Sequence, residues 1–323
     1  MIKEIIRNLY MITLPMPFRL KHVHVYALVH DGKVTLFDTG LNTPETFSIL
    51  ETAMKRIDRS IQDIDRIFIS HRHGDHCGMA GRIKAASGAE ILMSDLDHAF
   101  IRIADQEDLM IREMNLFYLR HGLGENALVT LASILKGFKK MTGSFTLDRP
   151  LKQGECHMVG DWTCEVLSSP GHSTGHTCFF FREQGLLLAG DHILPDITPN
   201  LSPDLFEPSF RPLKRFLESL SEMRDLPVRM VCPAHGQPFV NFQERIDEII
   251  DHHRERKGLT FASVRKNPKT AYEVSIDLFG PNLPEFDQFL AINETYVHLV
   301  ELVHEGLIEE EIRENLSFYG AIR

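Results

Sequence analysis

The segment ISHRHGDHCG gathers four side chains that commonly bind metal ions, namely His71, His73, Asp75 and His76. Imidazole nitrogens and carboxylate oxygens suit zinc, and they also suit iron or manganese. The four residues form the pattern H-x-H-x-D-H between an expected strand and an expected helix. Because the chain contains 17 histidines, a histidine-rich surface loop without a metal is the alternative explanation. The residues that flank the loop and the rest of the chain distinguish the two interpretations.

The spacing within this loop suits two metal ions. In an extended segment alternate residues lie on one side, so His71, His73 and Asp75 can share one side of the chain as it leaves the strand. His76 then turns with Asp75 toward a second point. We therefore expect His71 and His73 on one ion, and Asp75 and His76 on the other.

Three candidate ligands lie downstream, and each follows an expected strand. They are His172 in SSPGHSTGH, Asp191 in LLLAGDH and His235 in MVCPAHG. Neighbouring proline and glycine residues indicate tight turns at these positions. Single residues at strand ends along one rim of a sheet can assemble a site from distant parts of a sequence.

The elements that position these residues begin with β-structure. Residues 23–30 and 33–40 are β-rich runs joined by Asp-Gly, which predicts a hairpin. Thr43 followed by Pro44 is typical of a helix N-terminus, so PETFSILETAMKRI is expected to be a helix.

Two later segments have helical periodicity. Residues from about 95 to 142 predict a helical insertion, which either lines a substrate pocket or packs over the strand-rich part. Around Asn241 the strand pattern ends, and FQERIDEIIDHHRERK has apolar residues at helical spacing. We therefore expect a catalytic domain over residues 1–240 and a small, mostly helical domain over residues 241–323.

The composition is that of an ordinary globular protein, with 43% hydrophobic and 25% charged residues. No apolar stretch reaches the roughly 18 residues that span a bilayer, and the N-terminus lacks the features of a secretory signal. These features predict a cytoplasmic protein without membrane contact. The five cysteines include no C-x-x-C spacing, which argues against a disulfide framework or a structural zinc site. Cys77 is expected to pack beside the histidine loop.

The overall fold class follows from a family resemblance. With its H-x-H-x-D-H loop, the three downstream ligands and FDTG at residues 37–40 as an early motif, the chain resembles dinuclear metallo-β-lactamase-fold hydrolases over about residues 5–240. The resemblance implies an α/β fold, an αββα sandwich of two sheets. It implies one ion on His71, His73 and His172, a second on Asp75, His76 and His235, and Asp191 bridging the two.

The roles of the remaining candidates are less closely defined. Asp38 either orients a ligand-bearing loop or caps a turn. His176 and His192 either support the ligands or are satisfied polar residues. The histidines expected to be solvated or structural include His22, His24, His252 and His253.

The resemblance implies a hydrolase with two divalent ions, zinc first and iron or manganese as alternatives, and a bridging hydroxide as nucleophile. Asp75, as a proton relay, and Asp191 are the expected catalytic residues. The best-known true β-lactamases of this fold carry a cysteine or no bridging carboxylate where Asp191 stands, so antibiotic hydrolysis does not follow. The aspartate resembles that of glyoxalase II, acyl-homoserine lactonases and RNase Z, which cleave thioesters, lactones and phosphodiesters. A small ester, thioester or lactone is the first expectation for the substrate.

The C-terminal region provides the main alternative. It resembles the winged-helix-like region of a branch that includes a mitochondrial lactamase-like endoribonuclease, so a metal-dependent endoribonuclease or phosphodiesterase is the second hypothesis. The net charge of −10, and 16 acidic against 9 basic residues after position 240, disfavour nucleic-acid binding, although a local basic groove is compatible with the sequence. We expect the tail to pack, to shape a pocket or to form a homodimer.

A third hypothesis is an iron-dependent oxidoreductase of the persulfide dioxygenase type. Such enzymes use a single iron, and the complete second set of ligands weakens this option. The same complete set disfavours a binding module without catalytic activity.

Overall fold

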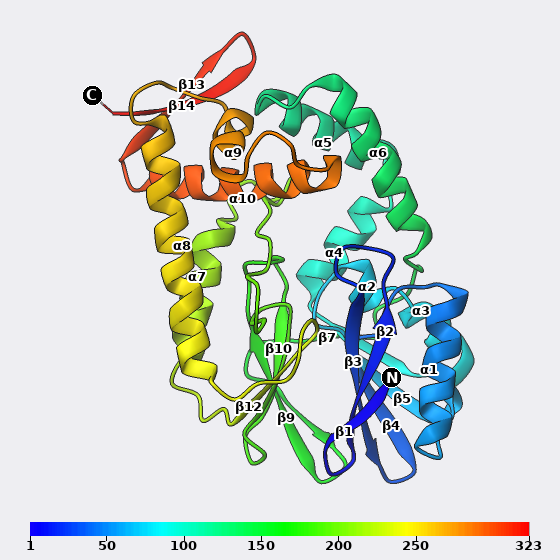
Figure 1. Cartoon of the computed structure of the whole chain (residues 1–323). Coiled ribbons are helices and arrows are strands. Elements are labelled where there is room, and N and C mark those ends of the chain that lie inside the picture. Colours follow the sequence, from blue (N-terminus) through cyan, green and yellow to red (C-terminus); the bar gives the residue numbers. More distant parts are fainter. Residues whose placement is uncertain (323) are drawn as a thin grey trace.

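Two β-sheets packed face to face form the centre of the molecule, and the computed structural model describes residues 1–322 (Figure 1). The first sheet has seven strands in chain order. They are β1 (Ile2–Ile6), β2 (Leu9–Pro15), β3 (His22–His30), β4 (Lys33–Phe37), β5 (Ile64–Phe68), β6 (Glu90–Met93) and β7 (Arg149–Pro150). Strands β1 to β4 pair antiparallel, and β4 to β7 pair parallel.

The second sheet has five strands in the order β12-β11-β10-β9-β8. They are β8 (Cys156–Val159), β9 (Trp162–Ser168), β10 (Thr177–Phe181), β11 (Leu186–Gly190) and β12 (Met230–Pro233). Strands β11 and β12 are parallel, so their carboxyl ends, which precede two of the predicted ligands, meet at the same edge.

Strand β10 shows why strands of the second sheet are continuous apolar runs in the sequence. Side chains alternate between the two faces of a strand, and both faces of β10 are covered. Phe179 points toward the first sheet, with its ring centroid 5.2 Å from that of Phe37. Phe180 points the other way and packs with Phe216 of helix α7 (Pro212–Met223).

Helices cover the outer face of each sheet (Figure 1). On the first sheet, α1 (Pro44–Arg56) and α3 (Ala80–Ser87) bury residues such as Leu50 and Ile83. On the second, α7 packs together with the first half of α8 (Phe242–Val264). The order of layers is α, β, β, α, which confirms the expected fold class.

The two local predictions near the N-terminus are confirmed. Strands β3 and β4 form a hairpin in which His30 pairs with Lys33. Helix α1 begins at Pro44, and the Thr43 side chain accepts a hydrogen bond of 3.1 Å from the backbone N–H of Thr46. Two short elements, η1 (Ile61–Asp63) and α2 (Gly74–Cys77), flank β5.

A second group of helices lies across one end of the sandwich (Figure 1). It comprises α4 (Asp95–Ala104), α5 (Glu107–Arg120), α6 (Glu125–Lys140), α9 (Ala271–Phe279) and α10 (Glu285–His304), with the hairpin β13 (Ile308–Arg313) and β14 (Leu316–Ala321). One apolar cluster joins α5 and α6 to α9, α10 and β14, through residues such as Tyr118, Ile292 and Tyr319. The helical segment at 95–142 and the C-terminal region therefore share a core.

The domain boundary near residue 240 and the winged-helix likeness stay predictions. Helix α8 begins two residues after that boundary and packs on the second sheet through its first half, including Ile246. Within residues 1–322, no helix combines the length and the apolar character needed to cross a membrane.

Candidate metal centre

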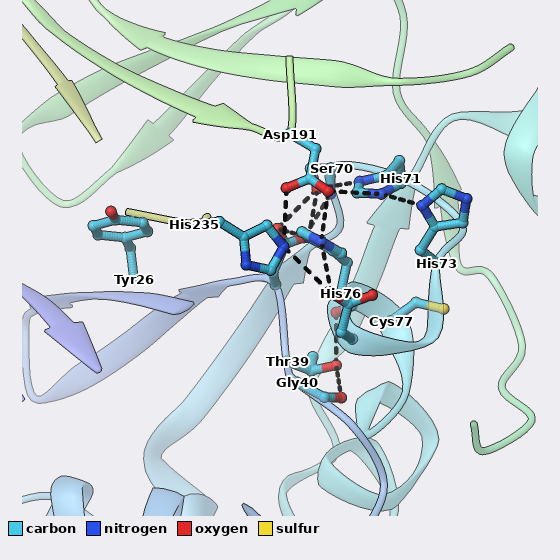
Figure 2. A network of polar contacts seen from close by, with 12 residues as sticks. Tyr26, Thr39, Gly40, Ser70, His71, His73, His76, Cys77, Asp191 and His235 are labelled. Atoms are coloured by element: carbon cyan, nitrogen blue, oxygen red, sulfur yellow. Dashed lines mark hydrogen bonds and ion pairs between the residues drawn. The ribbon is translucent and has the colours of Figure 1, made fainter. Parts of the chain in front are cut away.

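All seven predicted ligands lie close together, in two groups at one edge of the two sheets. Imidazole nitrogens of His71, His73 and His172 lie with a carboxylate oxygen of Asp191 within 4.8 Å of one another. The second group consists of Asp75, His76 and His235. Figure 2 shows Asp191 between His235 on one side and His71 and His73 on the other.

In the first group, three imidazole nitrogens face one point. His73 Nδ1 lies 2.9 Å from His71 Nε2 and 2.9 Å from His172 Nε2. The lone pairs of neutral rings repel at such distances unless a proton or a cation lies between them. Burial, reinforced by neighbouring histidines, lowers the pKa of both His71 and His73, so these rings are neutral near pH 7 and ready to bind a cation.

In the second group, carboxylates and imidazoles alternate. Asp75 Oδ2 lies 3.5 Å from His76 Nε2 and 3.4 Å from His235 Nε2. Burial alone would lower the pKa of His235, but Asp191 and Asp75 raise it to about 10. The pKa of His76 is likewise raised against its burial. Without a metal these two rings therefore hold protons, which a metal ion would displace.

Asp191 connects the two groups. Its Oδ2 lies 3.4 Å from His172 Nε2 and 3.5 Å from His76 Nε2, and its Oδ1 lies 3.4 Å from His235 Nε2. Among residues 1–322, neither Asp191 Oδ1 nor His76 Nε2 has a hydrogen-bond partner, although both atoms are buried. Buried polar atoms without partners are costly, and a cation on each side of Asp191 would satisfy both. The residues present therefore fit two metal ions.

Four of the five histidines direct one nitrogen into the site and have the other nitrogen held by the protein. This arrangement fixes the tautomer and the orientation of a ligand ring. The contacts are His71 Nδ1 to Ser70 Oγ at 3.0 Å, His76 Nδ1 to Asp38 Oδ2 at 2.8 Å, His172 Nδ1 to the Asn200 carbonyl at 2.8 Å, and His235 Nδ1 to the His22 carbonyl at 2.8 Å.

Residues of the FDTG motif hold the histidine loop in place through hydrogen bonds. Asp38 has a φ of 60°, and its carboxylate accepts hydrogen bonds from Ser70 N at 2.7 Å and Ser70 Oγ at 2.8 Å in addition to His76. Thr39 Oγ1 donates to the His76 carbonyl at 2.8 Å. Of the two roles expected for Asp38, these contacts support the orientation of a ligand-bearing loop.

The loop itself is less extended than expected. The His73 carbonyl accepts the N–H groups of His76 at 2.9 Å and Cys77 at 3.0 Å, which begins the short helix α2. This helical turn carries Asp75 away from His71 and places it with His76 and His235. Cys77 is buried and donates to the Arg72 carbonyl, as a packed side chain would.

His176 and His192 lie behind Asp191. His176 Nε2 accepts the Asp191 backbone N–H at 3.2 Å, and its Nδ1 lies 2.7 Å from Ser169 Oγ. Gly190 has a φ of 51°, and a Cβ there would lie 2.8 Å from His176 Nε2. His176 thus holds the turn that presents Asp191, whereas His192 is a buried polar residue that contacts Ser219 Oγ at 3.0 Å.

Three further histidines have structural surroundings. His24 Nε2 contacts the Gly236 carbonyl at 2.8 Å, and His253 Nδ1 lies 3.3 Å from His298 Nε2 inside the C-terminal region. His22 contributes its backbone carbonyl to His235, a role that no side-chain pattern indicates.

Asp97 of helix α4 is a site residue that the sequence did not reveal. Its carboxylate accepts hydrogen bonds from Arg72 N at 2.9 Å, Ser173 Oγ at 2.6 Å and Gly175 N at 2.8 Å. It therefore ties the loop of His71 and His73 to the loop of His172. Asp97 is fully buried, and its partners lie 25, 76 and 78 positions away, so no local motif could identify it.

We predict that Asp97→Asn weakens metal binding by about 10- to 100-fold, as is typical for residues that orient ligands. An amide group must turn its NH₂ toward at least one of the three donors, which loosens the two loops relative to each other. Titration against a chromophoric chelator measures the effect. Asp95→Asn is the matched control, because Asp95 is exposed at the start of the same helix. Equal affinities in the two variants would contradict this role of Asp97.

Comparison with known proteins agrees with the geometry of the site. The sequence profile of the Metallo-beta-lactamase superfamily matches residues 19–235, a range that includes all seven predicted ligands. A probable metallo-hydrolase of Bacillus subtilis (strain 168), YqjP, is 25% identical and covers 97% of this chain and of its own length. The beta-lactamase-like protein 2 homolog of Caenorhabditis elegans is 23% identical over 95% of this chain and 87% of its own.

The crystal structure of a metallo-beta-lactamase family protein from Thermus thermophilus is similar over the whole chain. The TM-score is 0.86 with 30% sequence identity, over 99% of this chain and 100% of the other. The similarity therefore includes the helices over the end of the sandwich and the C-terminal region.

Proposed function

This chain belongs to the Metallo-beta-lactamase superfamily, and from that premise we propose that it is a metal-dependent hydrolase that holds two divalent ions and cleaves a small ester, thioester or lactone. The position of Asp191 is the observation that carries the proposal. Its two carboxylate oxygens lie within 3.4 to 3.9 Å of histidine nitrogens from both groups, as expected for a ligand shared by two ions.

The chain would hold one ion on His71, His73 and His172, and the other on Asp75, His76 and His235. When bound, the two ions would lower the pKa of water from about 15.7 toward about 7 and polarise the oxygen that becomes negative. We propose zinc as the first candidate, because three-histidine and histidine–aspartate sets suit it, although iron and manganese accept the same ligands.

Asp75 and Asp191 are the residues that we place in catalysis. Asp75 would relay a proton, taking it from the attacking water and passing it to the leaving group. Asp191 would keep the two halves of the site at a fixed separation, so that both act on the same substrate bond. The backbone around Asp191 is held by His176, which limits its movement during turnover.

The charge of the protein supports a small substrate over a nucleic acid. The net charge is −10, and the region after position 240 carries 16 acidic against 9 basic residues. A phosphodiester chain is repelled by such a surface, which disfavours the endoribonuclease alternative. The complete second group disfavours an oxidoreductase with a single iron. A cytoplasmic location and a homodimer remain parts of this proposal.

Metal content tests the number of ions. We expect two equivalents of zinc or manganese in the purified protein by elemental analysis, and about one equivalent in His235→Ala, because the second group then loses a ligand. His304→Ala is the control, since His304 is exposed at the end of α10. One equivalent of iron in all three proteins would contradict the two-metal hydrolase and favour oxygen-dependent sulfur chemistry.

A substrate panel tests the reaction. It contains a chromogenic ester, a glutathione thioester, an N-acyl lactone and a single-stranded RNA. We expect turnover of at least one acyl substrate that disappears when a chelator removes the metal and returns when metal is added. Cleavage of the RNA alone would overturn the acyl proposal and support the phosphodiesterase alternative.

A further inference from the structure

The ring of His172 is oriented by a segment that lies outside its own loop. His172 Nδ1 lies 2.8 Å from the backbone carbonyl of Asn200, a residue 28 positions later in the chain. Because the carbonyl can only accept a hydrogen bond, it fixes the proton on Nδ1 and leaves Nε2 free to face His73 and Asp191. The position of the Asn200 carbonyl therefore decides where His172 Nε2 points.

Helix α10 holds this segment in place. The Asn200 side chain donates from Nδ2 to the Leu290 carbonyl at 2.9 Å, and the Leu201 backbone N–H donates to Glu294 Oε2 at 3.4 Å. Leu201 is fully buried. Residues on both sides of the Asn200 carbonyl are thus attached to the first half of a helix from the C-terminal region (Figure 1).

A second layer of hydrogen bonds joins α5 to the same point. Ser202 Oγ donates to Asn200 Oδ1 at 3.1 Å and accepts from Asn293 Nδ2 at 3.0 Å. Tyr118 OH of α5 donates to Asn293 Oδ1 at 2.6 Å. Each amide donates through its nitrogen and accepts through its oxygen, so the chain of hydrogen bonds is consistent from Tyr118 to the Leu290 carbonyl.

The burial of this network indicates that it has a specific role. Asn293 is 1% exposed and Tyr118 is 2% exposed, whereas the neighbouring residues of the same helices form an apolar cluster. Burying polar side chains costs free energy that apolar residues of equal size would avoid. A fully connected polar network instead fixes one relative position of its members, and here its last member is Asn200.

We propose that α10 and α5 form part of the metal centre, because they set the Asn200 carbonyl that orients His172. Asn200 and Asn293 are then positioning residues for the ion held by His71, His73 and His172. The C-terminal region thus has a more specific role than packing, since it contacts the segment that orients the candidate ligand His172. The inference rests on the proposed metal role of His172 and is independent of the substrate class.

The test compares a variant that removes a member of the hydrogen-bond network with one that destabilises α10 and leaves the network intact. Asn200→Ala removes the side chain that anchors the carbonyl, whereas Val297→Ala makes a cavity in α10 one turn after Asn293 without touching the network. We expect Asn200→Ala to weaken one of the two metal sites by about 10- to 100-fold, and Val297→Ala to retain the affinity of the unchanged protein even where it loses more stability. Chelator competition gives the affinities, and urea unfolding gives the stabilities.

The absorption spectrum of the cobalt-loaded protein provides a readout that a purely structural role would not move. We expect the visible bands of Co²⁺ to change in Asn200→Ala and to stay unchanged in Val297→Ala, because the bands report the arrangement of ligands. Ser202→Ala is a milder second variant, in case Asn200→Ala does not fold, and it should change the spectrum in the same direction.

A double-mutant cycle decides whether the residues act as one network. Asn293→Leu keeps the side-chain volume approximately and removes both hydrogen bonds of Asn293. If Asn200 and Asn293 act together, the double variant binds metal no more weakly than Asn200→Ala alone. Losses of affinity that merely follow the losses of stability would overturn the inference. An unchanged protein that binds no metal would instead overturn the proposed function, which keeps the two failures distinct.

Discussion

Replacing Asp191 with asparagine is expected to lower kcat/KM by about three orders of magnitude, which corresponds to roughly 4 kcal/mol of transition-state stabilisation. Asparagine keeps the size of the side chain but removes the negative charge that both groups share. Four histidine nitrogens lie 3.4 to 3.9 Å from this carboxylate. Among residues 1–322, no other carboxylate pairs with histidines of both groups, because Asp38 and Asp75 reach only the second group. No neighbour therefore replaces the lost charge.

The same substitution is expected to reduce metal content. The two groups of ligands would no longer be joined by an anion, so the repulsion between two bound cations would be less compensated. In the metal-free protein, Asp191 is the carboxylate that raises the pKa of His235 most. The pKa of that ring should therefore fall in the variant. A two-dimensional NMR titration of the histidine rings follows this change independently of activity.

Asp196→Asn is the matched control for this prediction. Asp196 lies five positions later and is exposed, so the same chemical change there should leave the metal content and kcat/KM unchanged. Elemental analysis and steady-state kinetics on the two variants give the comparison. If Asp191→Asn kept two equivalents of metal and normal turnover, the bridging role of this carboxylate would be wrong.

Replacing Asp38 with asparagine is expected to weaken metal binding by about 10- to 100-fold and to lower the free energy of unfolding by about 1 to 3 kcal/mol. The Asp38 carboxylate accepts three hydrogen bonds, from Ser70 N, Ser70 Oγ and His76 Nδ1. An amide in its place brings an NH₂ group against a donor in either orientation.

The His76 ring could escape this conflict only by changing tautomer. Its Nδ1 would then accept a hydrogen bond from the new amide, and its proton would move to Nε2. Because Nε2 is the nitrogen that faces Asp75 and Asp191, a proton there would block metal binding. The larger loss of affinity is therefore expected for the ion held by Asp75, His76 and His235.

Asp31→Asn is the matched control, because Asp31 also has a positive φ, 47° against 60° for Asp38, but lies exposed in the β3–β4 turn. Asparagine tolerates this backbone conformation, so backbone strain is similar in both variants. Chelator competition and chemical unfolding measure the two effects. A loss of stability in Asp38→Asn without any loss of metal affinity would show that Asp38 only caps a turn.

The seven candidate ligands could be identified from the sequence, because metal ligands are restricted to few residue types and because each candidate follows an apolar run. The H-x-H-x-D-H loop, His172, Asp191 and His235 all lie where strand ends were expected. The hairpin turn and the start of α1 at Thr43 were also predictable, since Asp-Gly turns and Thr-Pro helix starts act through contacts between near neighbours.

The detailed arrangement of the loop required the structure. Whether Asp75 faces His71 or His235 depends on the helical turn that begins at Gly74, and that turn is only four residues long. A segment so short carries no periodicity from which its conformation can be predicted. The spacing predicted the pairing of Asp75 with His76, but the helical turn that brings both residues to His235 became apparent only in the structure.

The residues that support the candidate ligands became apparent only from contacts between separate elements. Asp97 contacts Gly175 across 78 positions, Asn200 contacts Leu290 across 90, and Tyr118 contacts Asn293 across 175. Such pairs form because separate elements pack against one another, and each partner alone is an ordinary polar residue on a helix or loop. The chemistry of the site was therefore encoded locally in residue type and spacing, whereas its rigidity arises from contacts that exist only once the helices have packed over the sandwich.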